Sequence, residues 1–112
     1  DLAWCARGVR QAGFEVGVHT CGPPPWARLA RLPLDFLSFD AWRYPPPADS
    51  AIPWERLAWG LVPCTADAPD VPELRRRLPE PPPAVLTPAC GFAFLEPRAV
   101  EQVLQRLAAL TA

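Results

Sequence analysis

The stretch FEVGVHTCG at residues 14–22 decides the fold expected of this chain. Its first five residues alternate with only Glu15 polar, and β-branched valines occupy two of the positions. This short apolar pattern is typical of a buried strand, which we expect over residues 14–18. His19 then follows at the carboxyl end of that strand.

Helices and strands alternate on both sides of this stretch. Apolar residues at i, i+3, i+4 and i+7 predict a helix over residues 1–12, ended by Gly13, and another over about 97–109. Their expected core faces are Leu2, Cys5, Ala6 and Val9 in the first helix and Val100, Val103, Leu104 and Leu107 in the last. The other expected elements are a short helix at 26–32, strands at 34–39 and 57–62, a strand starting at 85–86, a helix at about 72–78 and a proline-rich loop at 41–53.

This alternation predicts an α/β fold with parallel strands and right-handed crossovers. The carboxyl ends of such strands are where ligands bind, and His19, Asp40, Cys64 and Cys90 all fall there. Four βα units are about half of an eight-unit barrel, which usually needs about 250 residues. We therefore expect residues 1–112 to be a single partial domain, the C-terminal half of a (β/α)8 TIM-type barrel. Because its open edges would be exposed, it should require an N-terminal half-barrel in cis or from a partner chain.

The composition excludes several classes of function. A net charge of -1 gives no basic excess for nucleic acid, and no apolar run approaches the roughly 20 residues of a membrane span. The N-terminus lacks the pattern of a secretion signal, so we expect a cytoplasmic location, where the four cysteines stay reduced rather than forming two disulfides. With no methionine and Asp1 first, the chain has the character of an excised or truncated segment.

His19 and Cys21 form the candidate metal-binding pair. They lie two residues apart, so on an extended strand end both side chains point the same way and can share one tetrahedral ion. A further ligand must come from elsewhere, and Cys90 is the best candidate. The H-x-C spacing alone is a weak signal, because buried cysteine and histidine more often pack in a core.

Four longer motifs relate the chain to a known family. They are VHTCG at 18–22, LDFLSFD at 34–40, WGLVP at 59–63 and LTPACGFA at 86–93. In this order they resemble the catalytic domain of the cobalamin-independent methionine synthases, above all the short methionine-synthase-like proteins. The resemblance covers about residues 2–110, and TPA before the late C-G is its most specific piece.

The resemblance implies a zinc cofactor and a reaction. The family's zinc ligands match His19, Cys21, Asp40 and Cys90, although the family usually has glutamate where this chain has Asp40. The implied activity is methyl transfer from a methyl-tetrahydrofolate to the thiol of homocysteine, which gives methionine. Zinc would hold that thiol as a thiolate while the carboxylate ligand leaves or loosens. The family's residues that grip homocysteine, and much of its folate surface, lie earlier than Asp1, so the acid and base residues stay unknown here.

Two alternatives stay open beside this reading. One is a related zinc-dependent methyltransferase that uses another donor or another thiol, and the other is an inactive metal-binding or scaffold fragment. The remaining polar and aromatic residues are interpreted as structural. They are Cys5, Cys64, Trp42 and Trp59 in packing, Asp35, Asp67 and Asp70 in turns, loops or caps, and Arg75, Arg76 and Arg77 on a solvated helix face.

Overall fold

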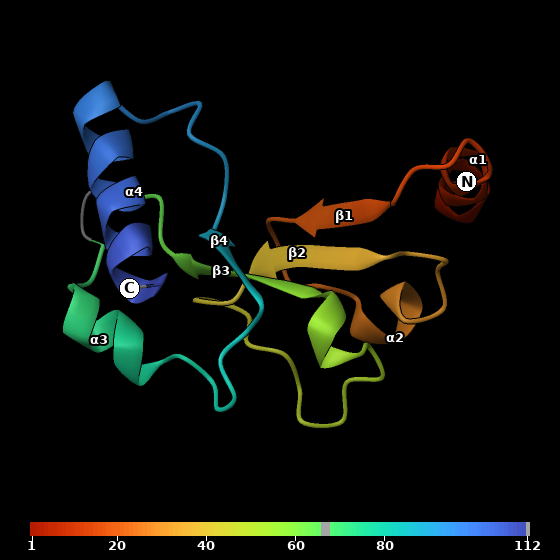
Figure 1. Ribbon diagram of the computed structural model, residues 1–112, viewed down its shortest axis with the longest axis horizontal. Helices are drawn as coiled ribbons and strands as arrows, with labels where there is room; N and C mark the ends of the chain where they lie inside the picture. The colour runs from red at the N-terminus through yellow and green to blue at the C-terminus, as the bar shows by residue number, and fades with distance from the viewer. Residues whose placement is uncertain (66–67, 112) are drawn as a thin grey trace.

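The chain folds into one curved layer of parallel strands with helices packed beside it (Figure 1). The computed structural model describes residues 1–65 and 68–111, so the loop role expected of Asp67 lies outside the described residues. The elements are α1 (Leu2–Gln11), β1 (Gly17–Thr20), α2 (Trp26–Leu29), β2 (Phe36–Asp40), the 3-10 helix η1 (Trp54–Arg56), β3 (Leu57–Val62), α3 (Val71–Arg76), β4 (Val85–Pro88) and α4 (Pro97–Thr111). No helix among the described residues is long and apolar enough to cross a membrane.

The sheet has the strand order of a barrel segment. Within the described residues, its four strands are all parallel and lie in the order β1-β2-β3-β4. Each new strand therefore adds on the same side as the last, without the reversal of order found in doubly wound sheets. The α/β class and the parallel strands are confirmed, and the order is compatible with part of a barrel.

The start of β1 differs from the sequence-based expectation. The strand begins three residues later than the predicted 14–18, and Phe14 is 69% exposed. Asp35 explains the difference, because its carboxylate accepts the Val16 N–H at 2.7 Å and its own N–H donates to the Val16 carbonyl. These two hydrogen bonds join Val16 to Asp35 immediately before the first β1–β2 pair, which agrees with a turn role for Asp35. His19 consequently lies inside the strand instead of beyond its end.

One face of the sheet carries the larger hydrophobic core. Phe39 is fully buried there, and its ring meets those of Trp26 and Trp59 edge-on, with centroids 5.0 and 5.5 Å apart. The other buried members are Ala6, Leu29, Leu34, Leu37, Ala41 and Leu57. A second cluster joins β3 to α3 and α4 through Leu61, Val62, Leu74, Val103 and Leu110. Packing is thus confirmed for Trp59, and for Trp42, which borders the second cluster.

Two expected core faces need correction. In α1 only Ala6 is buried, whereas Cys5 and its apolar neighbours Leu2 and Val9 are exposed, so the packing role of Cys5 is wrong. Figure 1 shows that α1 lies at the end of the molecule beyond β1, and Ala6 is its one buried residue, which belongs to the first core cluster.

In α4, Leu104 is exposed, and the packed face runs through Val103, Leu107 and Leu110 instead. That face keeps helical spacing but is rotated slightly from the predicted one, because α4 packs against β4, α3 and β3 together.

The polar residues of the second half hold helix ends and loops. Asp70 caps α3 by accepting the Glu73 N–H at 2.9 Å, as expected. The three arginines at residues 75–77, at the end of α3 and its C-cap, are exposed, but two of them also make tertiary contacts. Arg75 donates to the Ala109 carbonyl at 2.7 Å, and the Arg77 guanidinium lies 3.7 Å from the Trp42 ring centroid.

The opposite face of the sheet is open. Because side chains alternate along a strand, His19, Ser38, Ala58 and Val85 share this face in one row across the strands. A groove of about 500 Å³ runs over it, and its lining includes the 43% exposed Phe36 and the 48% exposed Val85. The open face leads to the carboxyl edge of the strands, where the candidate ligands lie.

Candidate metal centre

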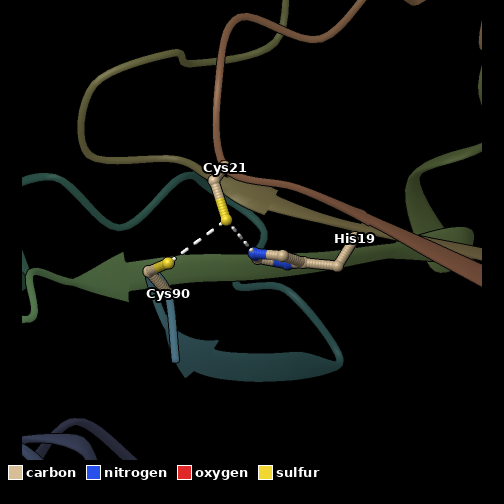
Figure 2. Close-up of side chains that lie close together, drawn as sticks. All are labelled: His19, Cys21 and Cys90. Carbon is tan, nitrogen blue, oxygen red and sulfur yellow. Dashed lines mark hydrogen bonds between the residues drawn. The ribbon is translucent and has the colours of Figure 1, made fainter. Parts of the chain in front are cut away.

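Within residues 1–65 and 68–111, three ligand-type side chains meet at the carboxyl edge of the sheet (Figure 2). His19 lies in β1, Cys21 is the first residue after β1, and Cys90 lies two residues beyond β4. The His19 Nε2 and Cys21 Sγ atoms are 3.2 Å apart, and the two sulfur atoms of Cys21 and Cys90 are 3.1 Å apart. All three ligand atoms lie within 4.8 Å of one another, so the group could hold a metal ion.

The meeting of Cys21 with Cys90 brings together the segments that follow the two outer strands. β1 and β4 are the outer strands, and two strands lie between them. In a flat sheet, three spacings would keep the outer strands about 14 Å apart. Instead their carboxyl-terminal segments converge until the two sulfur atoms are within hydrogen-bonding distance. The segments that follow β1 and β4 therefore bend toward each other at the carboxyl edge of the sheet.

Gly60 allows the backbones on both sides of β3 to approach it closely. A Cβ atom at that position would collide with the Phe39 carbonyl oxygen and would lie 2.8 Å from the Ala89 Cα. The β3–β4 pairing also shifts register between Gly60 and Val62, and the ladder resumes where the Ala89 N–H donates to the Val62 carbonyl at 2.9 Å. These backbone contacts set the position of the segment that carries Cys90.

The donor set fits a zinc ion. Two sulfurs and one imidazole nitrogen are typical zinc ligands, and soft thiolates select zinc over the oxygen-preferring cations. Two sulfur ligands about 2.3 Å from one tetrahedral zinc ion lie about 3.8 Å apart, a little more than the separation of Cys21 and Cys90. Both side chains are exposed and can adjust by that amount. Three protein ligands with an accessible fourth position are the pattern of a catalytic zinc site.

Asp40, the fourth expected ligand, is not part of this group of three. It ends β2 and is 6% exposed, and its carboxylate turns to the loop that follows, where it accepts the Arg43 N–H at 3.0 Å. The second carboxylate oxygen lies 3.8 Å from the Arg43 Nε. Asp40 thus caps the turn after β2, and its role as a metal ligand stays a prediction.

Cys64 lies beside the group without joining it. Its thiol donates to the Cys90 carbonyl at 3.2 Å, which ties the loop after β3 to the loop after β4. Burial, as the main cause, raises the pKa of the Cys64 thiol. The contact agrees with the structural role expected of this cysteine.

The Cys21 thiol is disposed to stay protonated until a metal binds, because its pKa is raised. The hydrogen bond with Cys90 is the main cause that raises the pKa of the Cys21 thiol, and the nearby Cys90 and Asp40 charges act in the same direction. A thiol must lose its proton to bind a metal ion. Metal uptake at this site should therefore release protons to solvent.

Sequence reasoning missed one member of the site, Ser38. Its Oγ lies 2.9 Å from the His19 Nδ1, on the side of the ring away from Cys21. The alternation of LDFLSFD places Ser38 on the same face as Asp40, which was a usable signal. That it stands opposite His19 depends on the β1–β2 register, which the sequence does not display.

A scan of protein-family models finds no match to this chain, and searches of curated proteins and of solved structures find none either. The resemblance to cobalamin-independent methionine synthases therefore stays a prediction, supported by the motifs themselves.

Proposed function

We propose that His19, Cys21 and Cys90 bind zinc and that the chain is part of a methyltransferase which methylates the thiol of homocysteine. The observation that carries the proposal is the convergence of these three side chains at the carboxyl edge of a parallel sheet. Two distant parts of the sequence, 69 positions apart, supply the two sulfur atoms. Packing of two cysteines alone would not explain why an exposed histidine, His19, also lies at hydrogen-bond distance from one of them.

The chain's own residues would prepare the site for a substrate thiol. Cys21 and Cys90 would supply two negative ligands, and His19 a neutral one through Nε2, which leaves the fourth position for the substrate sulfur. A zinc ion held there would lower the pKa of that thiol, so that the sulfur is available as a nucleophile near neutral pH. The exposure of all three ligands leaves the approach to this position free.

The proposed reaction is balanced in atoms and protons. The homocysteine thiol gives up its proton, and its sulfur attacks the N5-methyl carbon of a methyl-tetrahydrofolate. The bond between that carbon and N5 breaks, and its electron pair stays on N5, which takes up one proton. Methionine and tetrahydrofolate are the products, and no oxidant or reductant is needed.

We further propose that the fold is the C-terminal half of a (β/α)8 barrel. The one-directional strand order and the meeting of Cys21 with Cys90 across the sheet support this. The open groove beside Phe36 and Val85 is the surface that an N-terminal half-barrel, in cis or from a partner chain, would cover. That half would supply the residues that bind homocysteine and the methyl-tetrahydrofolate. A cytoplasmic location, where thiols stay reduced, accords with the proposal.

Zinc content is the first test of this proposal. The chain is purified under reducing conditions, and its metal is measured by inductively coupled plasma mass spectrometry. We expect one zinc ion per chain, lost in Cys90→Ser and kept in the matched control Cys5→Ser, because Cys5 is exposed and stands apart from the group. Absence of zinc, or its retention in Cys90→Ser, would contradict the proposal.

Methyl transfer is the second test. Methionine formation from homocysteine and a methyl-tetrahydrofolate is followed with the chain alone and with an N-terminal half-barrel of a methionine synthase added. Methylation of another thiol in place of homocysteine would favour the related methyltransferase. A zinc-loaded chain that methylates no thiol in either mixture would identify an inactive metal-binding fragment.

A further inference from the structure

The His19 ring is held from both sides, and the side away from the cysteines belongs to Ser38. The Nδ1 atom lies 2.9 Å from the Ser38 Oγ, while Nε2 lies 3.2 Å from the Cys21 Sγ. We propose that Ser38 is a positioning residue, whose hydroxyl orients the His19 ring so that Nε2 faces the metal position. The inference rests on the proposed metal site, and it goes beyond that proposal by assigning a residue that touches neither metal nor substrate.

The chemistry of imidazole makes this contact consequential. A neutral ring carries one hydrogen, and the nitrogen without it is the one that can bind a metal ion. With Nε2 as the ligand, Nδ1 must carry the hydrogen and needs an acceptor, which the Ser38 Oγ supplies. Without this acceptor the ring can rotate, and the other tautomer would place a hydrogen on Nε2 where the ligand lone pair is needed. Such partners of metal-binding histidines typically change metal affinity by about 10- to 100-fold.

The fold holds Ser38 firmly enough for this role. Ser38 and His19 are paired in the β1–β2 ladder, so neighbouring strands fix the separation of their backbones. Its two neighbours along β2, Leu37 and Phe39, are fully buried on the other face. The serine therefore stands on a strand anchored by the core, and its short side chain has little freedom to leave the ring.

The test compares zinc affinities by competition with a chromophoric chelator, and it needs no catalytic activity. Ser38→Ala should weaken binding by about 10- to 100-fold, whereas Ser38→Thr, which keeps the hydroxyl, should restore most of the affinity. A double-mutant cycle with His19→Ala separates positioning from a general structural effect. If Ser38 acts through the ring, Ser38→Ala should cost nothing further once His19 is absent.

The outcomes are distinguishable from those of the proposed function. Unchanged zinc affinity in Ser38→Ala would overturn the inference while leaving the metal site intact. The same would follow if Ser38→Ala weakened binding equally with and without His19, or if Ser38→Thr behaved like alanine. A wild-type chain that binds no zinc would defeat the proposed function and this inference together. Cobalt-substituted wild type and Ser38→Ala should also differ in their ligand-field spectra, whereas identical spectra would count against a change in ring orientation.

Discussion

Replacing Gly60 with alanine should damage both the fold and the metal site. The added Cβ atom would press on the Phe39 carbonyl oxygen, on the Ala89 Cα at 2.8 Å and on the Pro88 carbonyl oxygen at 3.0 Å. All three are backbone atoms, of β2 on one side and of β4 and the residue after it on the other, so no side-chain rotation can relieve the contact. β4 would have to move away from β3, and Cys90, the next residue after Ala89, would move with it.

The sign of the change in the free energy of unfolding distinguishes overpacking at Gly60 from the general effect of replacing glycine with alanine. In a strand with room for the methyl group, glycine to alanine would stabilise the protein by about 0.4 to 1 kcal/mol, mainly by restricting the unfolded chain. Overpacking costs about 1 to 3 kcal/mol, and rigid backbone neighbours put Gly60 at the upper end. A cost of about 3 kcal/mol, less the roughly 0.4 to 1 kcal/mol gained from the more restricted unfolded chain, leaves a net loss. We therefore expect Gly60→Ala to lower the free energy of unfolding by about 2 kcal/mol. Displacement of Cys90 should also weaken zinc binding. If about 1.4 kcal/mol of the cost falls on the metal site, the affinity for zinc drops by about tenfold.

Urea unfolding of the metal-free chain measures the first effect, and chelator competition measures the second. Gly91→Ala is the matched control, because Gly91 directly follows Cys90, but apart from its two chain neighbours no described residue has an atom within 4 Å of its added Cβ. This control should stay within about 0.5 kcal/mol of wild type. If Gly60→Ala is as stable as wild type, or more stable, the close backbone approach in β3 is refuted.

Three further predictions concern the core and the other thiols. Phe39→Ala should lower the free energy of unfolding in urea by about 3 to 5 kcal/mol, since the side chain is fully buried, and a loss below about 1 kcal/mol would contradict its central position. Zinc should protect Cys21 and Cys90 from iodoacetamide while Cys5 is labelled with or without metal, and equal labelling of all three in peptide mass spectra would argue against the site. Burial raises the pKa of Cys64 above its ordinary 9.0, so the folded state favours the protonated thiol. The protonated Cys64 thiol should therefore contribute to the free energy of unfolding of the metal-free chain below pH 9.0, and this stability should be lost as the pH rises through the raised pKa. Unfolding curves at neutral and alkaline pH should show a smaller loss of stability in Cys64→Ala.

The sequence by itself determined the elements whose local signals were complete. β3 occupies the predicted residues 57–62, because a continuous apolar run of this length that ends at Pro63 is typical of a buried strand. α4 begins at the predicted Pro97, which is preset for a first helical turn, and it runs only slightly beyond its predicted end. The pairing of His19 with Cys21 was also visible, since the two-residue period of a strand is a local property.

Only the tertiary structure decided which groups meet. The contact of Cys21 with Cys90 depends on how the segments after β1 and β4 converge and on the backbone approach at Gly60, and the partnership of Ser38 with His19 depends on strand register. Neither leaves a periodic mark in the sequence, because each joins residues from separate strands. The same holds for the exposed Cys5, whose helix has an apolar stripe but little of the core within reach. Local pattern fixes which way a side chain points along its own element, whereas its neighbours are set by how the elements pack.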